Sequence, residues 1–184
     1  MYRIFPSPKQ CTFYHNTLSC TSYGSVTTAP EIEESCRAAG FDPATLLASV
    51  FPGGFSPEGI TLTAEYVSCA PEGFQLNIAP SGIRISCGDG AGFFYALGVL
   101  VQLAAQAGGT LPCAEIADEP VLSVRGIMLD IGRDKIPAME TLRRLIDLFA
   151  SMRINHLQMY MEGFSFDYED FHYLFTNETP MTPA

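Results

Sequence analysis

Residues 74–87 read FQLNIAPSGIRISC and decide the fold of the first part of the chain. Apolar residues occupy every second position on both sides of Pro80-Ser81-Gly82, as they do in half-buried strands. Two alternating runs around a Pro/Gly turn are typical of a β-hairpin. We therefore expect two antiparallel strands here.

An apolar helix is predicted directly after this hairpin, from Ala91 to Gln106, ending near Gly108-Gly109. The segment is apolar almost all round, so we expect it to lie between a sheet and a further layer. It is interrupted by two glycines and Gln102, and a membrane span needs about 18 consecutive apolar residues. Membrane insertion is therefore not expected.

The residues before the hairpin predict a mixture of strands and helices. Prolines mark where elements end, acidic residues mark the first turn of a helix, and β-branched residues indicate strands. The expected elements are an extended run Tyr2–Phe5, a strand Thr21–Thr28, helices Glu31–Ala39 and Asp42–Val50, and a strand Ile60–Val67. After the apolar helix, Ala114–Ala117 is expected to form an edge strand.

A change of pattern at Asp118-Glu119-Pro120 predicts a domain boundary. The chain then continues as a strand, a helix and a strand, over 124–131, 139–153 and 154–161. This order is typical of a βαβ unit with parallel strands. The predicted class is thus α+β, with a small antiparallel-sheet domain and packed helices over 1–117, and a second domain beginning within 118–184.

The composition limits the partners and the compartment. The chain has 184 residues, of which 47% are hydrophobic, and its 20 acidic and 10 basic side chains give a net charge of −10. Such a surface repels phosphate backbones, so no nucleic-acid partner is expected. Residues 1–6 lack a basic stretch followed by an apolar one. We expect a cytoplasmic protein, or a secreted one if a leader has been trimmed.

The six cysteines are expected to be free and mostly buried. None of them forms a C-x-x-C pair, and a chain of this length does not need disulfides to hold its core. Unpaired cysteines are usually buried in proteins. Their redox state stays open from the sequence alone.

The segment Arg125-Gly126-Ile127-Met128-Leu129-Asp130-Ile131-Gly132-Arg133, followed by Ile136-Pro137, resembles the first barrel strand of glycoside hydrolase family 20, the β-N-acetylhexosaminidases. Ile154-Asn155 resembles the start of their second strand, and residues 72–103 resemble the small domain before the barrel. Residues 116–120 resemble the joint. The resemblance implies a domain 2-like first domain followed by the first part of a truncated (β/α)8 TIM barrel.

The resemblance also implies an activity. Enzymes of this family remove terminal N-acetylhexosamine, GlcNAc or GalNAc, by a retaining route in which the 2-acetamido group of the substrate attacks the anomeric carbon, without a metal or cofactor. An Asp-Glu pair on the fourth barrel strand assists. A barrel needs about 250 residues, whereas 64 follow Pro120 here. The catalytic pair is therefore expected to be absent and the chain alone inactive, and Thr182-Pro183-Ala184 is typical of a helix start.

Two residues are candidates for substrate binding. Arg133 follows the first barrel strand, at the face where such barrels place their active sites, and the family's matching arginine binds sugar hydroxyls. The alternative for Arg133 is a surface ion pair with Asp130 or Asp134. Glu162 ends the second strand at the same face and is a second candidate for shaping the sugar pocket. No catalytic residue and no metal ligand is predicted within the chain.

Other residues of these strands are expected to be structural. Arg125 and Asp130 favour pairing with each other or with neighbouring loops, and His156 favours a packed position in the core. The second strand, residues 156–162, departs from the better-known family members, so the linkage and the aglycone stay open. The oligomeric state stays open too.

Two other interpretations remain. In the first, the chain is a non-catalytic carbohydrate- or protein-binding scaffold module with a barrel remnant as its tail. In the second, the same small domain comes from another glycosidase family. The Arg-Gly to Arg motif favours family 20 over the latter, and the continuation of the reading frame into a barrel with an Asp-Glu pair would exclude the former.

Overall fold

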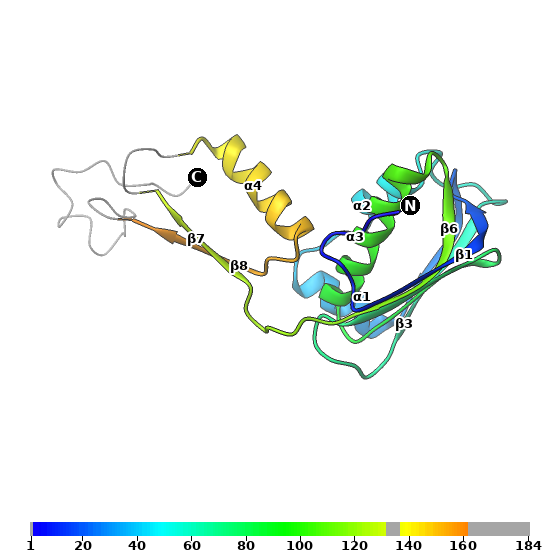
Figure 1. Cartoon of the computed structure of the whole chain (residues 1–184), viewed down its shortest axis with the longest axis horizontal. Coiled ribbons are helices and arrows are strands. Elements are labelled where there is room, and N and C mark those ends of the chain that lie inside the picture. Colours follow the sequence, from blue (N-terminus) through cyan, green and yellow to red (C-terminus); the bar gives the residue numbers. More distant parts are fainter. Residues whose placement is uncertain (1, 132–136, 162–184) are drawn as a thin grey trace. The chain divides into compact units, whose positions relative to one another are not determined.

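The computed structural model describes residues 2–131 and 137–161. The chain divides into two compact units, Met1–Val121 and Leu122–Ala184. The described residues form a sheet and three helices in the first unit, and two strands and one helix in the second. Figure 1 shows these elements. Each unit is described by itself.

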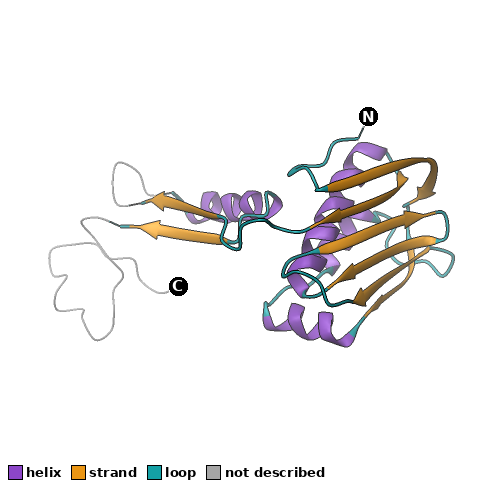
Figure 2. Ribbon diagram, turned by 60° about the horizontal axis from the view of Figure 1, so that its bottom comes forward, coloured by secondary structure: helices purple, strands orange, loops and turns teal. Residues whose placement is uncertain are grey.

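The first unit is built on a six-stranded sheet with the strand order β1-β6-β4-β5-β3-β2. Its strands are β1 (Gln10–Ser19), β2 (Tyr23–Thr28), β3 (Ile60–Tyr66), β4 (Phe74–Ala79), β5 (Gly82–Cys87) and β6 (Thr110–Asp118). Its helices are α1 (Pro30–Ala38), α2 (Ala44–Val50) and α3 (Gly90–Ala107). All three helices lie on one face of the sheet (Figures 1 and 2). The predicted α+β class is confirmed.

The hairpin predicted from residues 74–87 is present. Strands β4 and β5 pair antiparallel, from Phe74 opposite Cys87 to Ala79 opposite Gly82. The alternating apolar residues all point to the helix-covered face, where Leu76 and Ile85 are almost completely buried. The period-2 pattern therefore identified both the strands and the buried face.

The sheet is mixed, so the predicted antiparallel sheet is wrong for one half of it. Strand β3 pairs in parallel with β2 on one side and with β5 on the other. Parallel neighbours need a crossover connection, and α1 and α2 supply it between β2 and β3. The parallel contact with β5 arises because the hairpin returns its second strand between β4 and β3.

The N-terminal residues differ from the prediction as well. Residues 2–4 are not part of a strand, and the first strand is β1, which the sequence did not predict. The Gln106 amide accepts from Arg3 N at 2.9 Å and donates to Arg3 O at 2.7 Å. Gln102 makes the same two contacts with Phe5, at 2.7 and 2.8 Å. Two glutamines one helical turn apart thus hold the segment along α3.

Strand β6 was expected at the edge of the sheet, and it lies inside it. It extends from Thr110 to Asp118 and pairs antiparallel with β1 on one side and β4 on the other. The unpredicted β1 occupies the edge. The burial of Leu111, Ala114 and Ile116 is consistent with this inner position.

Helix α3 forms the centre of the hydrophobic core. Phe93, Leu97, Leu100 and Leu103 are fully buried. Asp89 caps its first turn by accepting from Gly92 N at 2.7 Å, and Gly108 ends it with a φ of 60°. Among the described helices, α3 is the one whose length and composition would suffice to cross a membrane, and half of it is buried inside the domain. Core helices meet the same criterion.

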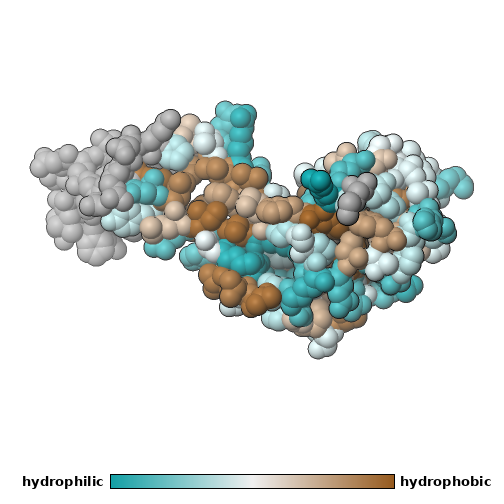
Figure 3. Space-filling model, viewed as in Figure 1, coloured by the Kyte–Doolittle hydropathy of each residue, from teal (hydrophilic) through white to brown (hydrophobic). Residues whose placement is uncertain are grey.

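The described residues of the second unit form β7 (Gly126–Asp130), α4 (Met139–Ser151) and β8 (His156–Tyr160). Its two strands pair in parallel, as the sequence predicted. Much of its apolar surface is open, with Met128, Ile146 and Leu148 about half exposed or more. Apolar side chains gather over β7, β8 and α4 in Figure 3. That these elements begin a TIM barrel remains a prediction.

Candidate functional site

The candidate site lies at the carboxyl ends of β7 and β8. The two strands pair in register from Gly126 opposite His156 to Asp130 opposite Tyr160. Ile131 N then donates to Tyr160 O at 2.9 Å, and Ile131 is buried. The carboxyl ends of the two strands therefore lie side by side. In βα barrels, active sites are built at this end of the strands.

The two predicted substrate-binding residues follow this edge in the sequence. Arg133 comes three residues after Asp130, and Glu162 comes two residues after Tyr160. Both lie outside the described residues, so their role in sugar binding remains a prediction. The structure describes the two strand ends to which they are attached.

Arg125 and Asn155 fix the opposite end of the strand pair. The Arg125 guanidinium donates to the backbone oxygens of Arg153 at 2.6 Å and Leu122 at 2.7 Å. The Asn155 side chain accepts from Arg125 N at 2.8 Å and donates to Ser123 O at 2.8 Å. These bonds join the segment before β7 to the turn before β8, which sets the register of both strands.

The structural role expected for Arg125 agrees with this geometry, although its contacts are with backbone oxygens as well as with a side chain. Asn155 is the residue that sequence reasoning did not assign, beyond its resemblance to a family position. An asparagine directly before a strand often forms hydrogen bonds with backbone groups of the adjoining turn, because its side-chain amide both donates and accepts. That signal was available in the sequence.

His156 is exposed, so the predicted packed position in a core is wrong for the described chain. It lies beside Gly126, where an added Cβ would approach the imidazole to 3.3 Å. The glycine therefore gives room to the histidine across the strand pair. The prediction rested on the position of His156 near the start of a strand, the end of a barrel that usually serves stability.

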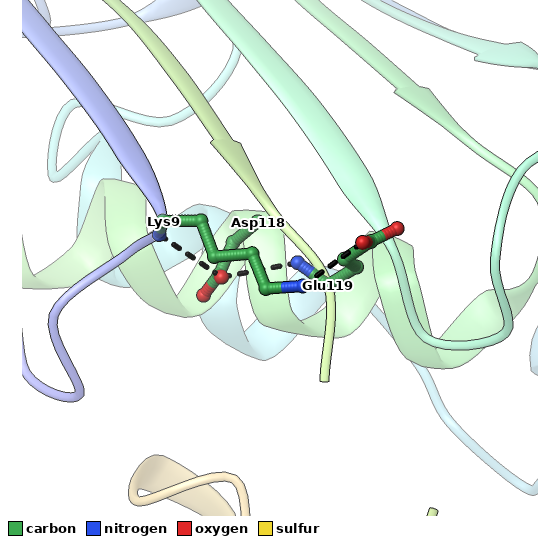
Figure 4. A network of polar contacts seen from close by, with 3 residues as sticks. All are labelled: Lys9, Asp118 and Glu119. Atoms are coloured by element: carbon green, nitrogen blue, oxygen red, sulfur yellow. Dashed lines mark hydrogen bonds and ion pairs between the residues drawn. The ribbon is translucent and has the colours of Figure 1, made fainter. Parts of the chain in front are cut away.

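Polar residues also tie together the end of β6 and the segment before β1 (Figure 4). The Asp118 carboxylate accepts from the backbone N of Lys9 at 3.2 Å and of Glu119 at 3.0 Å. Lys9 Nζ lies 2.9 Å from Glu119 Oε1. Because both ionic side chains are about half exposed, this pair adds little stability by itself. The pair joins the segment before β1 to the residue that follows β6, and we call it the Lys9–Glu119 clamp.

The described residues offer no group of three or more His, Cys, Asp or Glu side chains that would hold a metal. All six cysteines are free, and four of them are buried. Burial is the main cause that raises the pKa of Cys87, to about 12. A nucleophilic cysteine needs a lowered pKa, because the thiolate is the reactive form, whereas burial raises the pKa of these thiols.

Comparison with known proteins gives a family for the first unit. Residues 1–119 match the family described as glycosyl hydrolase family 20, domain 2. A β-hexosaminidase of Akkermansia muciniphila is 32% identical over 93 residues, which cover 49% of this chain and 19% of that protein. A β-hexosaminidase of Vibrio vulnificus is 27% identical over 158 residues, covering 86% of this chain and 18% of that protein.

Solved structures share the fold. The family 20 exo-β-N-acetylglucosaminidase of Vibrio harveyi aligns with a TM-score of 0.68 at 22% identity, over 85% of this chain and 25% of that one. The β-N-acetylhexosaminidase of Bacteroides fragilis aligns with a TM-score of 0.68 at 23% identity, over 85% of this chain and 32% of that one. The chain thus spans about a fifth of the curated relatives and a quarter to a third of these solved structures.

Proposed function

This chain belongs to glycosyl hydrolase family 20, and on that premise we propose that it is the N-terminal part of an enzyme that removes terminal N-acetylhexosamine residues from glycans. The observation that carries the proposal is the family match over the whole first unit, residues 1–119. Relatives named β-hexosaminidase support the same class of hydrolase.

The second unit is proposed to be the start of the catalytic barrel. The Vibrio vulnificus alignment covers 158 residues, which is more than the first unit contains, so it extends into the second. A parallel strand, helix and strand is the repeating unit of a (β/α)8 barrel. The half-exposed apolar side chains of β7 and α4 would be covered by the following barrel elements.

Arg133 and Glu162 are proposed to contact the substrate from the first two barrel strands. A guanidinium presents a rigid fork of donors, which suits neighbouring sugar hydroxyls. The register of β7 and β8 supports the pairing of these two positions at one edge. The substrate's acetamido oxygen would act as the nucleophile, assisted by an Asp-Glu pair from a later barrel strand. The chain by itself is therefore proposed to be inactive.

Hydrolysis of 4-nitrophenyl N-acetyl-β-glucosaminide tests this function. The full-length protein, translated from the continued reading frame, is expected to release 4-nitrophenol, and the 184-residue chain is not. The matched control is 4-nitrophenyl β-glucoside, which has no acetamido group and so cannot supply the nucleophile. Equal rates on the two substrates would contradict the mechanism, and turnover by the purified chain alone would contradict its inactivity.

A further inference from the structure

The face of the six-stranded sheet that the helices leave open is lined by polar and small side chains. Strands β3 to β6 send large apolar side chains to the opposite face, where these are buried: Leu62, Phe74, Leu76, Ile78, Ile83, Ile85, Leu111 and Ile116. Because side chains alternate along a strand, the positions between them share the open face. The helices of the first unit lie on the other side (Figures 1 and 2).

The strand register arranges these polar positions in two neighbouring rows that cross the sheet. Each row takes one residue from each of the strands β1, β6, β4, β5 and β3, and neighbouring strands are about 4.8 Å apart. The first row is Gln10, Ala117, Gln75, Ser86 and Glu65. The second row is Thr12, Glu115, Asn77, Arg84 and Thr63.

Three depressions with shared lining residues lie along these rows, and we call them together the open-face groove. Their volumes are about 260, 540 and 400 Å³. The first two share Gln75 and Ser86, and the second and third share Asn77 and Arg84. In the first row, the short side chains of Ala117 and Ser86 lie between longer neighbours, so the surface is depressed at these two positions.

The charges in the groove favour a neutral ligand. Arg84 Nε lies 3.4 Å from Glu65 Oε1, and Lys9 Nζ lies 2.9 Å from Glu119 Oε1. Both cations that line the groove lie beside a carboxylate, and Glu115 and Asp118 add two further carboxylates to its lining, so the charge of the described groove disfavours an anionic ligand. Gln75, Asn77 and the hydroxyl side chains provide donors and acceptors without charge.

Tyr14 adds an aromatic ring beside the groove. It follows Thr12 by two residues on β1, and the nearby Glu115 carboxylate is the main cause that raises the pKa of its hydroxyl. The Tyr14 side chain is 49% exposed. An aromatic ring with an open apolar face next to amides and hydroxyls is suited to a pyranose ring.

We infer that the open-face groove binds a neutral oligosaccharide, at a site distinct from the strand ends of β7 and β8. This inference rests on the proposed function, since a neutral glycan is the substrate class of the proposed enzyme. Sugar hydroxyls can form hydrogen bonds with the amide and hydroxyl side chains of the two rows, and the carboxylates of the described groove outnumber its two cations, which disfavours acidic polymers.

A titration of the 184-residue chain with penta-N-acetylchitopentaose, followed by backbone amide shifts in NMR, tests the inference. Shifts are expected for residues of β4, β5 and β6, with saturation in the millimolar range or below. The double variant Gln75→Ala/Asn77→Ala is expected to bind at least about fivefold more weakly, because two neutral hydrogen-bonding groups are lost. The matched control Glu33→Ala/Glu34→Ala changes two exposed polar residues of α1 on the other face and should bind like the parent chain.

Absence of shifts at these strands at 10-fold molar excess and millimolar concentration, in a chain with a dispersed spectrum, would overturn the inference. Unchanged binding by the Gln75→Ala/Asn77→Ala variant would overturn it as well. Preferential binding of a sulfated oligosaccharide at the groove would also contradict it. Because binding is measured without hydrolysis, the groove and the proposed enzymatic function fail or succeed separately.

Discussion

Truncation of Leu97 should lower the stability of the first unit strongly. Leu97 is fully buried in α3 and belongs to the core cluster. Replacing a buried leucine by alanine removes contacts and leaves a cavity, and about 2–5 kcal/mol of unfolding free energy is lost. Urea unfolding of Leu97→Ala against the parent chain measures it. Val101→Ala, at a partly exposed position of the same helix, should cost clearly less. A loss below about 0.5 kcal/mol for Leu97→Ala would place α3 at the periphery.

Arg133 is expected to act in binding and not in stability. Charge-assisted hydrogen bonds contribute about 1.5–3 kcal/mol, so Arg133→Ala in the proposed full-length enzyme should lower kcat/KM at least about tenfold. Its melting temperature should barely change. Arg144→Ala is the matched control, because Arg144 forms an exposed i,i+4 ion pair with Glu140. A variant of Arg133 with normal kinetics and a much lower melting temperature would show that this arginine is structural.

The six cysteines should separate into two reactivity classes. Cys11 and Cys69 are exposed, and Cys20, Cys36, Cys87 and Cys113 are buried. Burial raises the pKa of Cys87 to about 12, so its thiolate is scarce at pH 8. Titration with Ellman's reagent at pH 8 is expected to detect two fast thiols in the folded chain and six in urea. Fast reaction of all six without denaturant would mean that the core opens readily, and fewer than six in urea would reveal a disulfide.

At the scale of single elements, Asp89 connects the first turn of α3 to the loop before β4. One of its carboxylate oxygens accepts from Gly92 N at 2.7 Å and the other from Glu72 N at 2.8 Å. Asp89→Ala is expected to lower the unfolding free energy by about 1–2 kcal/mol, since a helix cap and a loop contact are lost together. Asp89→Asn keeps an accepting oxygen and should lose less. Chemical denaturation of both variants measures the difference, and an unchanged midpoint for the alanine variant would contradict the capping role.

The sequence predicted the elements in which burial leaves a clear pattern of apolar residues. The β4–β5 hairpin alternates strictly, and α3 is a long apolar run with Gly108 directly after it, so burial alone specified them. Strand β7 was recognised through the Arg-Gly to Arg motif and by its place before a helix. For the strand pair β7 and β8, the expected parallel order agrees with the structure.

The sequence could not predict the elements that depend on tertiary contacts. Strand β1 lies at the sheet edge, and nine of its ten residues are exposed, so burial imposes no regular alternation of apolar and polar residues on it. It is a strand because it pairs with β6 across more than ninety residues of sequence. The parallel contacts of β3 were missed for the same reason, because they are set by where α1 and α2 return the chain beside β2 and by where the hairpin places β5.

The candidate site was predictable only in part. The prediction of Arg133 came from the family resemblance and that of Glu162 from its place at the end of a predicted strand, and no periodicity in the sequence marks either residue. The register that brings the ends of β7 and β8 together is visible in the structure alone. The open-face groove had no signal in the sequence, because its residues come from five strands and become neighbours only through the register.

At the scale of the whole molecule, the two units differ in how completely their apolar side chains are covered. The core cluster, from Ile4 to Ile116, lies entirely within the first unit. In the second unit Leu142 of α4 and Ile131 are buried, while Val124, Met128 and Met139 are more than 60% exposed. A self-sufficient domain rarely leaves so many large apolar side chains open. The first unit should therefore be the one that folds alone.

Truncation after Val121 tests this difference. The 1–121 chain keeps every residue of the core cluster and both partners of the Lys9–Glu119 clamp. We expect its urea midpoint to lie close to that of the first transition of the 184-residue chain, because no core contact is lost. Its binding of the dye ANS should be lower, since the exposed side chains from Leu122 onward are removed. The control is a chain ending at Asp89, which lacks α3 and β6 and is expected not to fold. If the 1–121 chain unfolded at a much lower urea concentration or bound more ANS than the 184-residue chain, the second unit would be part of the folding unit, and the division at Val121 would not mark an independently stable domain.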